Sequence, residues 1–150
     1  MIITSSAFDD GGMIPKKFTG DGGDINPELL IQNVPPEAKS LALILHDPDA
    51  PMSGGFIHWT LWNINPETTI IKEESIPPLS IEGMNSAGKG GYFGPCPPAG
   101  SPHHYHFYLY ALDTALDLLE NASVQMLQKE IDGHVIATAE LVGLYGRTQE

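Results

Sequence analysis

Prolines and glycines interrupt this chain so often that few segments can form a long regular element. The 150 residues include 16 glycines and 13 prolines, many of them clustered, as in GDGG at 20–23 and GKGGYFGPCPPAG at 88–100. Both residue types mark turns, and proline also removes a backbone hydrogen-bond donor. The spacing predicts a single mainly β domain over residues 1–150, built from short strands as a sandwich.

Three apolar segments stand out as strands. They are SLALILHD at 40–47, FIHWTLWNI at 56–64 and HHYHFYLYALD at 103–113, each rich in aromatic or β-branched residues or bounded by turn residues. The stretch 65–102 between the second and third is rich in turns. A segment of this kind inside a compact domain usually has a function or covers something.

Helix signals appear only near the C-terminus, where we expect one or two short helices. Ser123 can cap a helix that carries Val124, Leu127 and Ile131 on one face, with Gly133 closing it. The following stretch VIATAELVGLYG at 135–146 fits either a short helix or a strand.

The charge of the chain excludes several classes of partner. Its net charge is −12, with only seven Lys plus Arg, which argues against nucleic acid and anionic membrane surfaces. A bound anion therefore has to be held by a local pocket against the overall field. No apolar run is long enough for membrane insertion, MIITSSAF does not resemble a secretory signal, and the single Cys96 leaves no internal disulfide, so a cytoplasmic protein is expected.

Alternation along a strand sends residues i and i+2 to the same face. On the third strand one face carries His103, Tyr105, Phe107 and Leu109, and the other carries His104, His106, Tyr108 and Tyr110. The first strand places Leu41, Leu43, Leu45 and Asp47 on one face in the same way. On the second strand the same alternation places four residues on one face, namely His58, Thr60, Trp62 and Ile64.

Each of the three strands thus has a polar group at the end of an apolar row. If the strands are neighbours in one sheet, Asp47, His58, His103 and Tyr105 converge on a pocket beside the rigid DPDAP and GPCPP loops. A carboxylate beside an imidazole favours the imidazolium form, which helps to bind an oxyanion. Asp47 and Asp49 also fit a second role, in which one carboxylate fixes the turn by accepting backbone N–H bonds.

Two other chemistries compete with a binding pocket. His104 and His106 have the spacing of two zinc ligands on one strand, with His46 or a carboxylate as a third, although an exposed polar face explains them more simply. Cys96 is a candidate nucleophile for a hydrolase if His103 or His58 serves as its base, whereas a small structural cysteine is the commoner case.

Taken in order, these motifs resemble the phosphatidylethanolamine-binding protein family, which includes the Raf kinase inhibitor proteins. The likeness is to its small bacterial and archaeal branch. It rests on DPDAP at 47–51, HW at 58–59 and GPCPPAGSPHHY at 94–105, together with SSAFDDGGMIPKKFTGDGGDINPEL and GHVIATAELVGLYGR towards the two ends.

The resemblance implies a β-sandwich with a large central sheet and a small pocket at one edge for phosphate-like anions. Asp47, His58, His103 and Tyr105 fall on the pocket positions of the family, Gly94, Pro95 and Pro98 on its rim, and Asp49 on the second acidic position of DPDAP. His104 replaces the arginine that is common in the family, so an ion pair with a neighbouring carboxylate becomes titratable. The resemblance also implies a homodimer and a kinase or protease partner.

The first hypothesis is therefore a non-enzymatic binding protein for a small anion, such as phosphate or a phosphoryl headgroup, with no cofactor. The alternatives are a hydrolase that uses the Asp–His group or Cys96, and a zinc site at His104 and His106.

Overall fold

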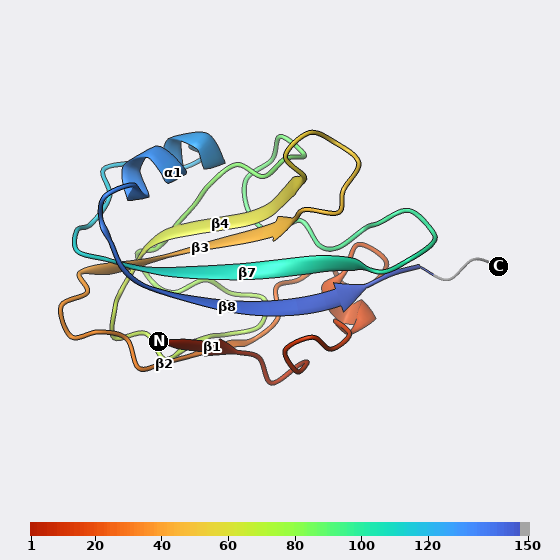
Figure 1. The fold of residues 1–150 in the computed structure, drawn as a ribbon, viewed down its shortest axis with the longest axis horizontal. Helices are drawn as coiled ribbons and strands as arrows, with labels where there is room; N and C mark the ends of the chain where they lie inside the picture. The colour runs from red at the N-terminus through yellow and green to blue at the C-terminus, as the bar shows by residue number, and fades with distance from the viewer. Residues whose placement is uncertain (148–150) are drawn as a thin grey trace.

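Five antiparallel strands form the larger of two sheets in this computed structural model, which describes residues 1–147 (Figure 1). Their spatial order is β6–β4–β3–β7–β8, with bounds β3 Ser40–Asp47, β4 Phe56–Ile64, β6 Ile81–Glu82, β7 His103–Leu112 and β8 Val135–Tyr145. The smaller sheet has the order β1–β2–β5, with bounds β1 Ile2–Thr4, β2 Leu29–Gln32 and β5 Ile70–Ile71.

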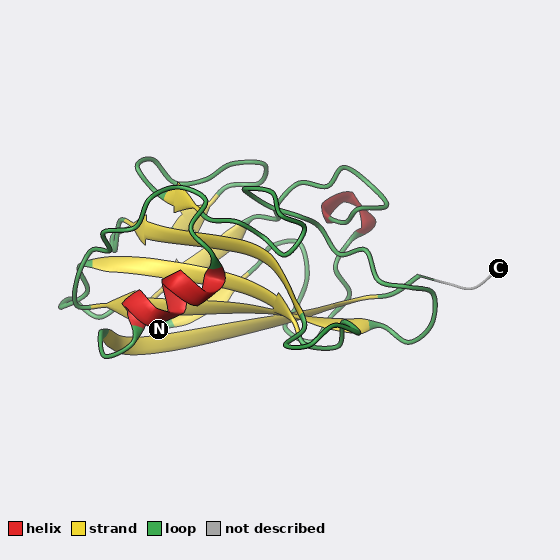
Figure 2. Ribbon diagram, turned by 90° about the horizontal axis from the view of Figure 1, so that it is seen from above, coloured by secondary structure: helices red, strands yellow, loops and turns green. Residues whose placement is uncertain are grey.

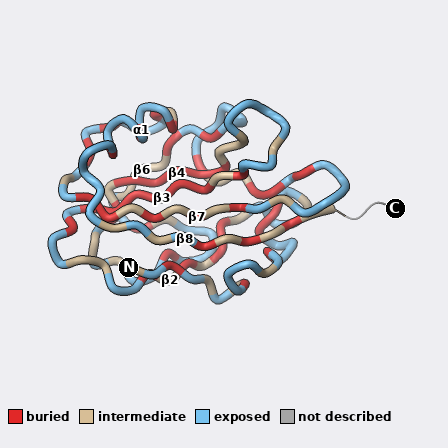
Figure 3. The backbone as a smooth tube through the Cα atoms, in the orientation of Figure 1, coloured by how far each residue is buried: buried red, intermediate tan, exposed pale blue. Residues whose placement is uncertain are grey.

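The main apolar core lies between the two sheets and contains side chains from both, such as Leu29 and Ile31 of β2 and Leu43 and Phe107 of the large sheet. A second core covers the outer face of the large sheet, where α1 (Val124–Ile131) packs against it (Figure 2). The central strands β3 and β4 are accordingly buried along most of their length (Figure 3). The predicted mainly β sandwich with a large central sheet is confirmed.

The single α-helix of residues 1–147 forms as its cap signals predict. The Ser123 hydroxyl accepts a hydrogen bond from the Met126 N–H at 3.2 Å, and Val124, Leu127 and Ile131 are buried. The structure adds a short 3₁₀ helix, η1 (Lys16–Phe18). The ambiguous stretch after Gly133 is a strand, because β8 pairs with β7 from His103↔Tyr145 to Leu112↔Val135. No helix within residues 1–147 is long and apolar enough to cross a membrane.

The predicted alternation holds on β3 and β7. Leu41, Leu43 and Leu45 lie in the core between the sheets together with Tyr105 and Phe107. Ile44 and Tyr110 belong to the outer side.

On β4 the predicted alternation is wrong. Trp59 and Leu61 lie in the inner core, whereas Trp62 lies in the outer one and Ile64 returns to the inner one. Two register shifts against β3 explain the difference, one between the pairs Leu45↔Trp59 and His46↔Ile57, the other between Leu43↔Leu61 and Leu41↔Ile64. Each shift inserts an extra residue into β4, which moves the following side chains to the other face.

The second bulge depends on the backbone conformation and the side-chain hydrogen bonds of Asn63. Asn63 has a left-handed φ of 54°, and its amide donates to the Leu116 carbonyl at 2.9 Å and accepts from the Leu116 N–H at 2.8 Å. Asn63→Ala loses both bonds and strains the backbone, so we expect its free energy of unfolding to fall by about 2–3 kcal/mol. Asn63→Gly keeps the backbone freedom and should lose less in urea denaturation; equal losses in the two variants would contradict a role for φ.

Candidate functional site

A cavity of about 250 Å³ lies at the end of the large sheet where β3 finishes and β7 begins. Its polar side chains are Asp47 from β3, His58 from β4, and His103 and Tyr105 from β7. The remaining walls come from Ala50, Pro51, Met52, Phe56, Phe93, Cys96, Pro97 and Pro98. The structure thus brings together the four side chains for which convergence was predicted, in a mainly apolar setting that strengthens their electrostatic interactions.

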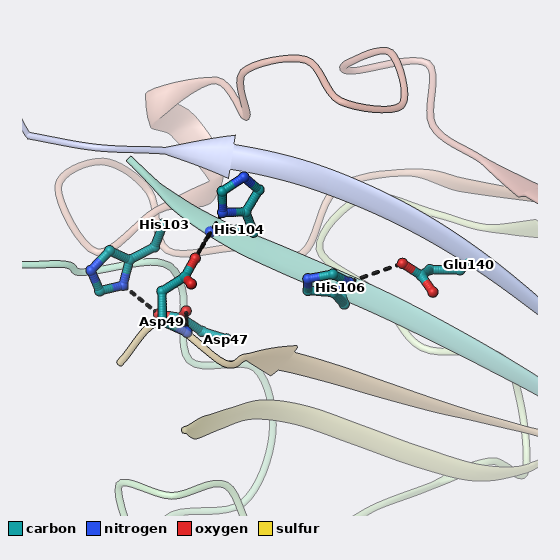
Figure 4. A network of polar contacts seen from close by, with 6 residues as sticks. All are labelled: Asp47, Asp49, His103, His104, His106 and Glu140. Atoms are coloured by element: carbon teal, nitrogen blue, oxygen red, sulfur yellow. Dashed lines mark hydrogen bonds and ion pairs between the residues drawn. The ribbon is translucent and has the colours of Figure 1, made fainter. Parts of the chain in front are cut away.

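Asp47 organises the polar end of this cavity, hereafter the pocket. Its Oδ1 accepts a hydrogen bond from the Asp49 N–H at 2.8 Å, and its Oδ2 lies 2.7 Å from His103 Nδ1. Asp47 is 3% exposed, so both oxygens of a buried carboxylate are occupied by protein donors. Because a carboxylate can only accept, Nδ1 of His103 carries the proton and Nε2 is left for a ligand (Figure 4).

The His58 imidazole is held by a backbone carbonyl, that of Phe93, rather than by a carboxylate. Its Nδ1–H donates to the Phe93 carbonyl at 2.6 Å, which leaves Nε2 as an acceptor. Burial lowers the pKa of the His58 imidazole, and this outweighs the raising effects of the Phe93 hydrogen bond and of Asp47. His58 reaches the pocket because of the first β4 bulge, which turns His58 and Trp59 towards the same side.

The Tyr105 hydroxyl is the least satisfied group of the pocket. The residue is fully buried and its hydroxyl has no hydrogen-bond partner among the described residues. Burial, reinforced by the charge of Asp47, raises the pKa of Tyr105 far above its usual range, so the hydroxyl stays protonated. Leaving a buried donor unpaired costs about 1–3 kcal/mol, and a bound oxygen atom would remove that cost.

The loop after Phe93 is anchored to the N-terminal segment by its first residues and lines the pocket with the later ones. The Gly94 N–H donates to Asp24 Oδ1 at 2.7 Å, and the Pro95 carbonyl accepts from the Gly20 N–H at 2.9 Å. Gly94 and Pro95 are therefore buried anchors of the loop and do not line the cavity, whereas Pro98 does. Of the three residues predicted for the rim, only Pro98 lines the cavity.

Asp49, predicted as a pocket residue, lies outside the cavity. Its Oδ2 accepts from both the backbone N–H and Nδ1 of His104, each at 2.8 Å, and the His104 imidazole is the main cause that lowers the pKa of Asp49. His104 thus keeps a contact with a carboxylate in place of an arginine. His103 and His104 leave β7 in different directions, each towards its own aspartate (Figure 4).

The structure does not support a zinc site at His104 and His106. His106 Nδ1 pairs with Glu140 at 2.9 Å and His104 with Asp49, and residues 1–147 contain no group of three potential ligands close enough to share an ion. Cys96 lines the pocket, but its Sγ accepts from Arg147 at 3.0 Å rather than from an imidazole. Arg147 in turn pairs with Asp21 at 2.6 Å.

Sequence reasoning missed the aromatic walls of the pocket. The Phe56 ring lies 4.6 Å from His58 and 5.5 Å from Phe93, and the His58 ring packs edge-on against Tyr105 at 5.3 Å. Phe56 is paired with Asp47 across β3 and β4, which the register shift conceals. Phe93 lies in the turn-rich stretch, where no periodicity marks it.

The fold is an antiparallel sandwich with a small, polar-ended pocket at one end of its large sheet. The family model described as phosphatidylethanolamine-binding protein matches residues 4–146. The chain belongs to that family.

Relatives and solved structures agree with this assignment. A UPF0098 protein of Pyrococcus horikoshii is 51% identical over 95% of this chain and 75% of its own length. A UPF0098 protein of Methanothermobacter thermautotrophicus is 47% identical over 98% of this chain and 99% of its own. The solved PEBP homologue CT736 of Chlamydia trachomatis has a TM-score of 0.92 and 44% identity, covering 97% of both chains. E. coli YbcL has a TM-score of 0.92 and 32% identity over 97% of this chain and 98% of its own.

The lowered pKa of His58 makes stability depend on pH. The folded protein disfavours a protonated His58. The stability gained from the neutral imidazole is therefore complete above the pKa of His58 in the unfolded chain, about 6.5, and it is lost as pH falls through the lower pKa of His58 in the folded protein. His58→Gln cannot titrate, and its unfolding free energy should fall less between about pH 8 and pH 5, as measured in urea. His134→Gln, in an exposed pair with Asp113, is the control; if His58→Gln and wild type lose equal stability, burial does not govern this imidazole.

Proposed function

We propose that this chain is a binding protein, not an enzyme, that holds a small phosphate-like anion together with a proton. The observation that carries the proposal is the Tyr105 hydroxyl, a buried donor that has no hydrogen-bond partner within residues 1–147 and lies at a cavity shared with two imidazoles. A ligand oxygen at this position would accept the hydrogen bond that the protein does not supply.

The second donor of the proposed complex is His103. Its Nδ1 is already committed to Asp47, so a proton taken up at Nε2 produces an imidazolium that faces the ligand while Asp47 balances its charge. Neither Lys nor Arg is found among the residues that line the pocket within the described chain. Binding of an anion against a net charge of −12 therefore depends on this one proton.

His58 adds the complementary acceptor. Since its Nδ1–H is given to Phe93 and its lowered pKa keeps it neutral, Nε2 can accept a hydrogen bond from a ligand hydroxyl. Two donors and one acceptor suit a hydrogen phosphate or a phosphoryl group that still carries a proton. Sulfate has no such proton, and we expect it to bind more weakly than phosphate.

Titration calorimetry tests this proposal with inorganic phosphate and phosphoethanolamine, at about pH 6 and pH 8, on either side of the imidazole reference pKa of about 6.5. Affinity should be higher at the lower pH, by up to about tenfold per pH unit for one proton taken up with the ligand. Repeating the titration in buffers of different ionisation enthalpy counts the protons taken up, after subtraction of those exchanged by the ligand itself.

Single-residue variants identify the side chains responsible for anion binding and proton uptake. His103→Ala should abolish both binding and proton uptake, and Tyr105→Phe should weaken binding about tenfold or more, because it removes only the donor to a charged acceptor. His134→Ala removes an imidazole at the other end of β7 and β8 and should bind as wild type. Binding that survives in His103→Ala, or that is unchanged between the two pH values, would contradict the proposal.

A further inference from the structure

A second cavity lies on the outer face of the large sheet, on the opposite side from the pocket. Its volume is about 550 Å³, and its floor contains Ile44, Tyr108 and Tyr110, the residues that alternate with the inward-facing ones on β3 and β7. Gln125 and Gln128 of α1 form one wall, and the loop residues Ser53–Gly55 and Met84–Ser86 belong to the others.

This cavity continues along the helix. A neighbouring cavity of about 610 Å³ shares Ile44, Tyr110 and Gln128 with it. Together they form an elongated groove between α1 and the sheet, hereafter the outer groove. A linear ligand of several units fits this shape better than a single small ion does.

The first cavity of the outer groove lacks formal charge. The chain has 19 acidic and 7 basic side chains, yet the described residues that line this cavity include none of them. His46, its one imidazole, is bonded through Nε2 to the Gly54 carbonyl at 2.8 Å. A charged ligand would find no counter-ion in this cavity, and the neighbouring cavity adds one residue of each sign, Lys129 and Asp132, so the groove as a whole has no net charge.

The neutral polar groups of the cavity fall into two sets. Asn85, Ser86 and Ser123 are bonded to backbone groups of their own loop, of β4 and of the α1 cap. In contrast, the side chains of Ser53, Tyr108, Tyr110, Gln125 and Gln128 make no hydrogen bond to the rest of the described chain. Hydroxyl and amide groups both donate and accept, which matches ligand hydroxyls that do the same.

Aromatic rings line the sheet side of the groove. Tyr108 and Tyr110 are two residues apart on β7, so their rings point to the same face, and the His106 ring stacks on Tyr108 at 5.5 Å and 12°. Flat rings with hydroxyls at their tips offer an apolar face for the C–H groups of a sugar ring and a polar edge for its hydroxyls.

From this combination we propose that the outer groove binds a neutral, linear oligosaccharide, independently of the anion pocket. A peptide in extended form is less suited, because β3, β4 and β7 each have strand neighbours on both sides and offer no free edge for main-chain pairing. The uncommitted tyrosine and glutamine side chains would instead recognise a ligand rich in hydroxyl groups.

The test is an NMR titration of the amide signals with two neutral probes, linear tetrasaccharides of β-1,4-linked glucose and of β-1,4-linked N-acetylglucosamine. At least one probe should shift signals of β7 residues 108–110 and of α1 without shifting those around His103. Tyr108→Ala and Gln125→Ala should each weaken binding about tenfold, as the loss of a stacked ring or of an amide contact implies. Thermal melting of both variants excludes unfolding as the cause.

Met126→Ala is the matched control, since Met126 is exposed on α1 but lines neither cavity of the groove. His103→Ala should keep saccharide binding, and Tyr108→Ala should keep phosphate binding, so the two sites can fail separately. The absence of shifts with both probes would overturn the proposal, and so would shifts that persist in Tyr108→Ala. If a polar peptide competes with the saccharide, the outer groove binds a protein partner instead. If sedimentation shows that wild type is a dimer and Tyr108→Ala a monomer, the groove is an interface between two copies of this chain.

Discussion

The carboxylate of Asp47 connects the parts of the molecule on which the pocket depends. One oxygen fixes the turn that follows β3 through the Asp49 N–H, and the other fixes His103 at the start of β7. Asp49 then binds the backbone and ring of His104, so two carboxylates direct adjacent histidines into different surroundings. Because Asp47 is buried, removing its imidazole partner would leave one carboxylate oxygen without a hydrogen-bond donor, at a cost of about 1–3 kcal/mol. The pocket is therefore held in shape before any ligand arrives.

The sequence predicted the fold class and most of the pocket because β3 and β7 keep an unbroken period of two. Asp47, His103 and Tyr105 were found in this way, and they line the pocket. His58 also lines it, although the alternation that selected it was wrong for β4. The second bulge of β4 depends on Asn63 and its bonds to Leu116, 53 residues away along the chain, and no local pattern reveals such a contact.

The other errors have the same origin. Gly94 and Pro95 were placed on the rim, but their bonds to Asp24 and to Gly20 pull them behind it. These partners lie about half the chain away, in the N-terminal segment that the sequence showed only as turns. Phe56 and Phe93 close the pocket for a similar reason, since register and loop path decide their positions. Periodicity predicts which face a side chain occupies, and long-range contacts decide which residues meet.

The loop between β3 and β4 belongs to both cavities. Its residues Ala50–Met52 line the pocket, whereas Ser53–Gly55 line the outer groove. Gly54 and Gly55 have left-handed φ values of 79° and 74°, and a Cβ on Gly55 would collide with the backbone of Asp47 and Pro48, so the loop has little freedom to change at one end alone. His46 and Asp47, neighbours on β3, hold it from the two faces of the sheet, through Gly54 and Asp49. Held from both faces, the loop gives each cavity a rigid wall, so a ligand can bind in one cavity without rearranging the other.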